Sequence, residues 1–154
     1  MNIDKPVSAA IGVGDPKIIC KLAEKFSKNE NISLPNLIHP NVIGDWENIE
    51  LGIGNIICAG NIFTTDIKIG SFNVFNLSCT IGHDCIIGNC NVFNPIVNIS
   101  GGINLGNSVL VGTGAQILQY LKITDNVIIG SGAVVTKDLE EEGAYVGIPC
   151  RKVR

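Results

Sequence analysis

The hydrophobic pattern of this chain repeats every six residues through its central part. From Leu51 to Val135 an aliphatic or aromatic side chain stands at every sixth position, and glycine often follows it. These positions are Leu51, Ile57, Phe63, Ile69, Phe75, Ile81, Ile87, Phe93, Ile99, Leu105, Val111, Ile117, Ile123, Ile129 and Val135. Neither an α-helix nor an alternating strand has a period of six, so the pattern predicts a supersecondary repeat.

A short strand and a turn in each hexad would let three hexads close a triangular coil. Every side chain would then stack on the residue 18 positions later, at the spacing of about 4.8 Å between paired strands. In that arrangement Asn55, Asn73 and Asn91 form an internal amide ladder, and Phe75 stacks on Phe93. Buried amides are costly unless they are paired, and a ladder of amides pairs them. The repeat therefore predicts a solid prism of about five coils.

The residues outside the strict repeat are expected to form smaller parts. The elements expected before the prism are a strand at 7–11, a glycine turn at 12–14, a helix at 16–28 and a strand at 34–38. This order resembles the closing half of a βαβ unit, which must lean on the prism, a symmetry mate or an absent piece. We therefore expect a partial α/β segment over residues 1–40, and a prism with a tail that folds back along it over residues 41–154.

Composition and charge limit the classes of function. The chain has 154 residues, of which 45% are hydrophobic and 16% charged, with a net charge of −3. It is long enough for one solid core and a small appendage. The basic residues are scattered and no aromatic platform accompanies them, so nucleic acid is not an expected partner. No apolar run reaches about 18 residues, and the first residues lack the pattern of a signal peptide, which predicts no membrane span and a cytoplasmic protein.

The cysteines and histidines do not indicate a disulfide framework or a metal site. Cys79 and Cys85 fall on an inward position of the repeat that takes small residues, so we expect small hydrophobes in a reduced compartment. The sequence has no CxxC pair, and its two histidines, His39 and His83, are far apart. We therefore expect no bound metal.

His83 is the histidine with the strongest indication of chemistry. It follows an inward Ile in the turn half of its hexad, so its side chain should point out of the prism beside Asp84. An imidazole with a neighbouring carboxylate is typical of a general base. On the next coil Gly101 and Gly102 would leave a notch where a thin ligand meets backbone amides. An exposed histidine with no chemical task is the alternative.

The glycine turn before the helix is a second candidate site. Free amides at Gly12 would suit a phosphate group. The alternative is that Gly12 and Gly14 only permit the turn, and the residues alone favour this structural role.

Three motifs resemble the bacterial sugar O- and N-acetyltransferases of the left-handed β-helix class. They are IGHDCIIG at 81–88, GSGAVVTKD at 130–138 and VGIPCR at 146–151. Within this class the chain resembles the sialic acid O-acetyltransferase family, which includes the acetyltransferases of UDP-4-amino-sugars for bacillosamine and perosamine. The resemblance implies an all-β, left-handed parallel β-helix of hexapeptide repeats with a small N-terminal α/β remnant. The period alone does not fix the handedness.

The resemblance also implies acetyl transfer from acetyl-CoA to an amine or hydroxyl of a sugar or nucleotide sugar. His83 would be the general base, Asp84 would raise its basicity, and a backbone amide would hold the developing oxyanion. The coenzyme would lie in a groove between neighbouring prisms of a homotrimer. The positions assigned to it are Val92, Gly101, Gly112, Thr113, Gly130 and Ser131, and Gly12 is assigned to the substrate.

Two departures from the family concern the acceptor. Position 92 is Val where several relatives carry a second histidine, and Lys17 stands where a relative has an acidic group. Relatives begin with a full Rossmann-like domain, whereas residues 1–40 correspond to its last part only. The alternative is therefore a non-catalytic or acceptor-deficient β-helix that serves as a scaffold or partner subunit. A metal-dependent enzyme similar to the γ-class carbonic anhydrases would need three histidines, and the chain has two.

Overall fold

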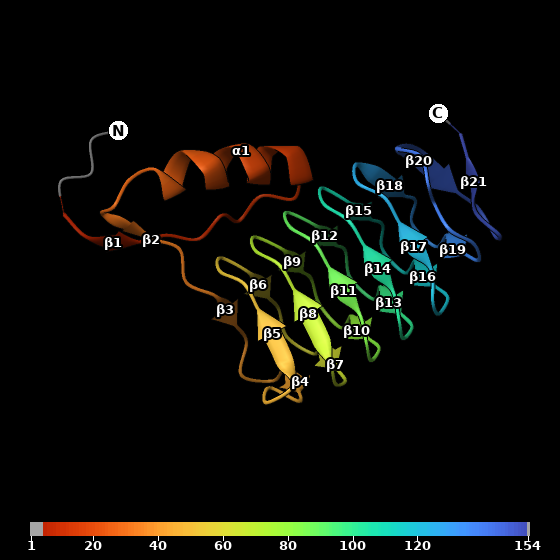
Figure 1. Cartoon of the computed structure of the whole chain (residues 1–154), viewed down its shortest axis with the longest axis horizontal. Helices are drawn as coiled ribbons and strands as arrows, with labels where there is room; N and C mark the ends of the chain where they lie inside the picture. The colour runs from red at the N-terminus through yellow and green to blue at the C-terminus, as the bar shows by residue number, and fades with distance from the viewer. Residues whose placement is uncertain (1–4, 154) are drawn as a thin grey trace.

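The chain folds into a left-handed parallel β-helix with one α-helix alongside it, as the computed structural model shows for residues 5–153 (Figure 1). Residues 1–4 and 154, at the ends of the two predicted domains, lie outside the described residues. Three long sheets form the faces of a triangular prism, and the pair β1–β2 stands apart from them. The predicted fold class is confirmed.

The strands of the prism are short and fall into three sheets. The eight-stranded sheet contains β3 (Leu37–Ile38), β6 (Ile56–Ile57), β9 (Val74–Phe75), β12 (Val92–Phe93), β15 (Leu110–Val111), β18 (Val127–Ile129), β20 (Gly143–Val146) and β21 (Arg151–Lys152). The six-stranded sheet contains β4 (Ile43–Gly44), β7 (Ile62–Phe63), β10 (Thr80–Ile81), β13 (Asn98–Ile99), β16 (Gln116–Ile117) and β19 (Val134–Val135). The five-stranded sheet contains β5 (Ile49–Leu51), β8 (Ile67–Ile69), β11 (Ile86–Ile87), β14 (Asn104–Leu105) and β17 (Lys122–Ile123).

Strand pairing follows the predicted step of 18 residues. Ile81 of β10, for example, pairs in parallel with Ile99 of β13. The prism is about one coil taller than the strict repeat predicted, because β3 and β4 also pair, with β6 and β7, although their residues precede that repeat. The coiled part therefore begins at Leu37.

The inward positions of the hexads form one continuous core. Phe75 and Phe93 lie parallel with their ring centroids 4.6 Å apart, which confirms the predicted stack. Phe63 meets Phe75 edge-on at 5.1 Å. Both arrangements are favourable for aromatic pairs and add to the burial of the rings. The core thus runs along the whole prism axis.

The predicted amide ladder is present, with a difference in how its steps are made. The Asn73 amide donates to Asn55 Oδ1 at 3.1 Å and to the Gly88 carbonyl at 3.0 Å. The next step uses the backbone, since the N–H of Asn91 donates to Asn73 Oδ1 at 2.9 Å. The Asn91 amide itself donates to the Gly106 carbonyl. Every rung is therefore satisfied inside the core, as a buried amide requires.

The N-terminal segment forms a small βαβ unit. β1 (Val7–Ser8) pairs in parallel with β2 (Ile32–Ser33), and α1 (Pro16–Ser27) connects them. Asp15 caps the helix by accepting from the N–H groups of Lys17 and Ile18, which explains why α1 begins there. The strand expected at 7–11 is shorter than predicted and exposed, and the one expected at 34–38 is wrong: its second half, β3, belongs to the prism.

Helix α1 lies against the eight-stranded sheet (Figure 1). Ile19 and Ala23 are buried there against Val92 of β12, whereas Ile18 is 46% exposed. A disulfide joins Cys20 of α1 to Cys90, with the Cα atoms 5.6 Å apart. The expectation of cysteines without disulfides holds for Cys79 and Cys85, which are free and buried, but was wrong for this pair. The segment leans on the prism of its own chain.

The C-terminal tail adds two strands to the end of the eight-stranded sheet, whereas it was expected to fold back along the prism. β20 pairs in parallel with β18, and β21 returns antiparallel to β20. The connection between β19 and β20 stays partly on the prism, because Leu139 is buried and forms a bridge with Ile123. Within residues 5–153, no helix is both long and apolar enough to cross a bilayer.

Candidate functional site

The turns between the strands stack into three edges, which we name by one residue each. The His83 edge has turns at 64–66, 82–84, 100–102, 118–120 and 136–138. The Asn89 edge has turns at 52–54, 70–72, 88–90, 106–108 and 124–126, and the Ser131 edge at 58–60, 76–78, 94–96, 112–114 and 130–132. The third turn residue often has a positive φ although it is not glycine, as in Asp66, Phe72, Ser78, Asp84, Cys90, Ile96, Ser108, Tyr120 and Asn126.

His83 and Asp84 form a pair on the outside of the prism. His83 Nδ1 lies 2.7 Å from Asp84 Oδ2, and the two side chains are 53% and 64% exposed. Asp84 adopts a φ of 58°, a conformation that Asp tolerates better than most residues. The carboxylate therefore occupies Nδ1 and orients the ring, which leaves Nε2 for a substrate.

The notch expected at Gly101 holds the imidazole itself. A Cβ atom at Gly101 would lie 2.6 Å from His83 Nε2 and 2.7 Å from its Cε1. At Gly82 a Cβ atom would lie 2.5 Å from the backbone nitrogen of Gly101. Glycine at both positions thus avoids a clash of an added side chain with the imidazole ring and with the backbone nitrogen of Gly101.

On the Asn89 edge, side-chain oxygens accept hydrogen bonds from the backbone N–H groups of the turns. The N–H of Ser71 donates to Asn89 Oδ1 at 2.7 Å, and the N–H of Asn89 donates to Asn107 Oδ1 at 2.8 Å. The N–H of Asn107 donates in turn to Asp125 Oδ1 at 2.7 Å. Side-chain oxygens of Asn and Asp therefore occupy the backbone N–H groups of this edge, which are not free to donate to a ligand.

The corresponding amides on the other two edges are open. Within residues 5–153, the N–H groups of Gly101 on the His83 edge and of Thr113 and Ser131 on the Ser131 edge make no hydrogen bond. Unpaired, accessible N–H groups are ready donors to oxyanions, carbonyls and phosphates. Sequence reasoning missed this contrast, although the signal was present: Asn89, Asn107 and Asp125 recur every 18 residues on one edge only.

The predicted coenzyme residues divide between two edges. Thr113 and Ser131 are exposed one above the other on the Ser131 edge, and buried Gly112 leaves room for the backbone of Gly130, whose carbonyl carbon would lie 2.7 Å from a Cβ at Gly112. His83, Asp84 and Gly101 lie together on the His83 edge, and the six-stranded sheet separates the two groups.

Two predicted residues reach neither edge. Val92 belongs to β12, and its side chain is 1% exposed because α1 covers it. Gly12 is exposed in the connection before α1, and a Cβ there would meet nothing within 4 Å.

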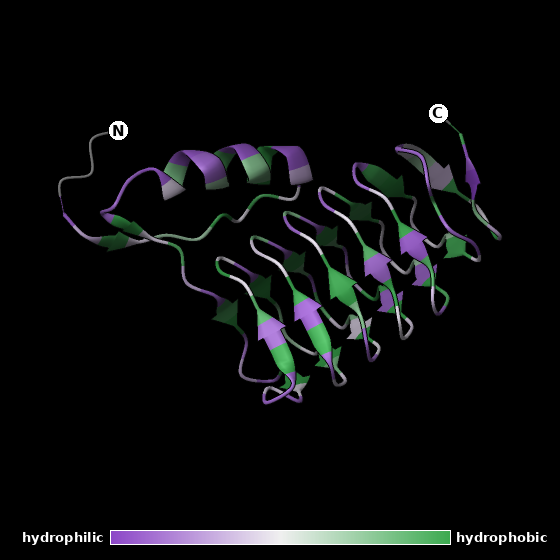
Figure 2. Ribbon diagram, viewed as in Figure 1, coloured by the Kyte–Doolittle hydropathy of each residue, from purple (hydrophilic) through white to green (hydrophobic). Residues whose placement is uncertain are grey.

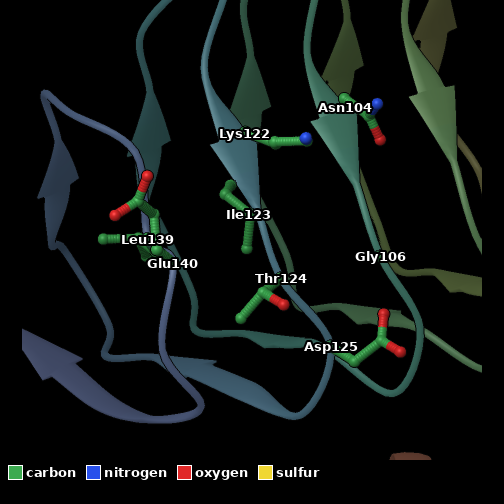
Figure 3. A pocket seen from close by; sticks show the side chains of 8 residues that line it. All are labelled: Asn104, Gly106, Lys122, Ile123, Thr124, Asp125, Leu139 and Glu140. Carbon is green, nitrogen blue, oxygen red and sulfur yellow. The ribbon is translucent and has the colours of Figure 1, made fainter.

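A hollow of about 360 Å³ lies on the five-stranded sheet and reaches the turns of the Asn89 edge (Figure 3). Its lining residues are Asn104, Gly106, Lys122, Ile123, Thr124, Asp125, Leu139 and Glu140. It forms where this sheet ends at β17, beyond which only the bridge from Leu139 continues. No residue assigned to the catalytic pair or to the coenzyme lines it.

The remaining titratable groups offer neither a thiolate nor a metal site. Burial raises the pKa of the Cys79 thiol to about 11 and also raises the pKa of Cys85. A buried thiol of high pKa is a poor nucleophile, so these cysteines are structural. Among residues 5–153, His, Cys, Asp and Glu form no group of three that would hold a metal ion.

Comparisons with solved structures relate the chain to sugar acyltransferases. PerB from Caulobacter crescentus, a perosamine N-acetyltransferase solved with CoA and GDP-perosamine, is 28% identical; the match covers 94% of this chain and 69% of that chain, with a TM-score of 0.90. WeeI from Acinetobacter baumannii AYE is 30% identical over 99% of this chain and 73% of that chain, with a TM-score of 0.90.

The acetyltransferase domain of PglB from Neisseria gonorrhoeae FA1090 is 24% identical over 94% of this chain and 69% of that chain, with a TM-score of 0.89, and shows a common fold. That domain has also been solved with acetyl coenzyme A. No family model and no curated protein sequence matches the chain.

Proposed function

Because the chain belongs to the hexapeptide-repeat sugar acetyltransferases, we propose that it transfers the acetyl group of acetyl-CoA to the amine of a nucleotide-linked amino sugar. The observation that carries this proposal is the oriented His83–Asp84 pair beside the open amide of Gly101. PerB, bound to CoA and GDP-perosamine, supports both the donor and the class of acceptor.

In this reaction His83 acts as the general base. Its Nε2 takes a proton from the sugar amine as the nitrogen attacks the thioester carbonyl. Asp84 accepts from Nδ1–H, which fixes the tautomer and stabilises the imidazolium that forms. The N–H of Gly101 donates to the carbonyl oxygen as negative charge develops there. His83 then gives its proton to the departing sulfur, so that the thiol of CoA leaves and the amide remains.

The donor groove is proposed between two copies of the chain. On one face α1 covers the eight-stranded sheet, and the five-stranded sheet carries charged residues such as the ion pair between Lys68 and Glu50 (Figure 2). The six-stranded sheet exposes two isoleucines, Ile43 and Ile62, at 65% and 41%, where the five-stranded sheet exposes one, Ile86. This face suits the threefold contact of a homotrimer.

Such a trimer would bring the His83 edge of one chain to the Ser131 edge of the next. The open amides of Thr113 and Ser131 would then donate to the coenzyme opposite His83. The α/β segment, predicted over residues 1–40, is assigned to the acceptor, with the exposed Gly12 turn toward its nucleotide. The residues present therefore fit a site in which the coenzyme lies between two chains and the α/β segment holds the acceptor.

A direct assay tests the proposal. Wild-type protein is incubated with acetyl-CoA and either GDP-perosamine or a UDP-4-amino-sugar, and thiol release and N-acetylated product are measured. We expect turnover with at least one of these acceptors, and a loss in kcat of about a thousandfold in His83→Ala, since general bases contribute roughly 10²–10⁴. His39→Ala is the matched control and should keep the wild-type rate, because His39 lies outside the His83 edge.

Two results would contradict the proposal in different ways. Coenzyme binding by calorimetry without acetyl transfer to any amino sugar would favour the non-catalytic scaffold. Turnover that survives in His83→Ala would leave an acetyltransferase with a different base.

A further inference from the structure

Tyr120 lies on the His83 edge, where both its exposure and its backbone conformation are unfavourable for the stability of the fold. It is the most exposed aromatic residue among those described, at 69%. Its φ of 60° is a left-handed conformation that costs a bulky residue roughly 1 kcal/mol or more. The other third-turn residues on this edge that adopt it are Asp66, Asp84 and Gly102, which tolerate it more easily. Burial and backbone preference do not explain a tyrosine here, although its ring packs on Gly102 as the ring of Phe72 packs on Gly54.

Other bulky residues in this conformation help to interpret Tyr120. Phe72, on the closed Asn89 edge, packs against the cluster beneath α1 and so has a structural role. Ile96 is 57% exposed and lies on the open Ser131 edge. Exposed bulky side chains at this turn position therefore occur on the edges whose amides are free for a ligand.

The rings of Tyr120 and His83 lie against adjacent glycines of the same turn. The two residues come from the coils on either side of Gly101 and Gly102. A Cβ at Gly101 would lie 2.6 Å from His83 Nε2, and a Cβ at Gly102 would lie 2.6 Å from Tyr120 Cε1. The two glycines are adjacent, so one ring leans forward and the other backward over the same short stretch of backbone. His83 and Tyr120 thus flank the turn at Gly101 and Gly102 from the coils on either side of it.

We propose that Tyr120 is an acceptor-binding residue whose ring stacks on the apolar face of the amino-sugar ring. This inference rests on the proposed function, because it deepens the acceptor side of that site. The C–H groups on one face of a pyranose meet the negative face of an aromatic ring favourably. Stacking on Tyr120 holds the sugar beside Nε2 of His83, the ring nitrogen that Asp84 leaves free, and so positions the amine for proton transfer.

The test compares Tyr120→Asn with Tyr120→Phe, using the acceptor that wild type acetylates faster of GDP-perosamine and a UDP-4-amino-sugar. Asn removes the ring and accepts the positive φ, so we expect a thermal midpoint equal to or above that of wild type. The KM for the sugar should rise roughly tenfold, as expected for one lost stacking contact, while the KM for acetyl-CoA stays within about twofold. Phe keeps the ring and should keep the sugar KM within about threefold.

Each other outcome overturns the inference. An unchanged sugar KM in Tyr120→Asn, with an active wild type, leaves the proposed function intact and removes Tyr120 from the acceptor site. A rise in the KM for acetyl-CoA instead assigns Tyr120 to the coenzyme. An equal loss in Tyr120→Phe assigns the effect to the hydroxyl rather than to stacking. If wild type acetylates neither sugar, the proposed function fails, and the inference fails with it.

Discussion

Single residues decide whether an edge of this prism is open to a ligand. All three edges have the same turn geometry, but Asn and Asp side chains fill the amides of one of them. On the His83 edge the equivalent place is taken by Gly101, which offers its N–H and accommodates the imidazole. The candidate chemistry therefore depends on a missing side chain as much as on the histidine.

Gly101→Ala tests this dependence. The added methyl group would displace the His83 ring, since its position lies 2.6 Å from Nε2. We expect kcat to fall by roughly tenfold to a hundredfold, because small displacements of a catalytic group have effects of that size. Asn104→Ala is the control, because Asn104 is exposed on β14 and is assigned to neither the coenzyme nor the acceptor. Steady-state rates and far-UV circular dichroism check the result; equal rates for both variants would contradict it.

Cys79 gives a prediction about pH. Burial raises the pKa of its thiol from an ordinary 9.0 to about 11, so the folded chain holds this proton more tightly than the unfolded chain does. The stabilisation is complete below the ordinary pKa and is lost as the pH rises from about 9 to about 11. Urea unfolding of wild type and Cys79→Ala at pH 8 and pH 10.5 measures this pH-dependent contribution to the free energy of unfolding.

The variant should lose less stability than wild type over that pH interval. Alanine fits the position, because Ala115 and Ala133 occupy the same inward column of the prism. Parallel losses in the two proteins would show that Cys79 carries no pH-dependent term.

Individual strands could be predicted here because each hexad places one hydrophobic side chain in the core at a fixed position. An inward residue at every sixth position specifies which residues face the core, and so placed His83 on an edge. The α/β segment lacks such repetition. Its strands are two residues long, too short for a pattern, and the real helix start was marked instead by Asp15 and Pro16. The Cys20–Cys90 disulfide joins elements 70 residues apart, which sequence spacing does not reveal.

The amide ladder couples successive coils, and Asn73→Leu tests it. The substitution leaves the N–H of Asn91 and the Gly88 carbonyl without a partner, whereas the Oδ1 of Asn55 keeps its hydrogen bond from the backbone N–H of residue 73. Each unsatisfied buried group costs about 1–3 kcal/mol, so we expect the free energy of unfolding to fall by about 3 kcal/mol or more.

Urea unfolding at one fixed protein concentration measures this change. Asn104→Leu is the matched control, because Asn104 is exposed on β14 and its loss should change stability by less than about 0.5 kcal/mol. Equal effects of the two substitutions would mean that the ladder does not stabilise the prism.

At the scale of the whole molecule, the sequence predicted the prism better than its surroundings. The hexads define coils and their register, but a period of six is compatible with either hand, so handedness came from the family resemblance. The functional division of the surface was also out of reach, because it depends on which face α1 covers and which amides side chains fill. Helix α1 leaves the five-stranded and six-stranded sheets uncovered, and the two open edges border the six-stranded sheet.

Mixed oligomers test whether those two edges meet between chains. His83→Ala damages one edge, and Thr113→Trp fills the other at an exposed position. Each variant alone should be inactive. In trimers assembled from equal amounts of both, a site is intact where the His83 edge of a Thr113→Trp chain meets the Ser131 edge of a His83→Ala chain. Random assembly produces this pairing at about a quarter of the interfaces, so about a quarter of wild-type activity should return after co-expression.

A double variant carrying both substitutions, mixed with wild type, is the control, since there each intact site needs two wild-type chains. No recovery in the first mixture would mean that each chain builds its site alone, and the proposed contact through the six-stranded sheet would be wrong.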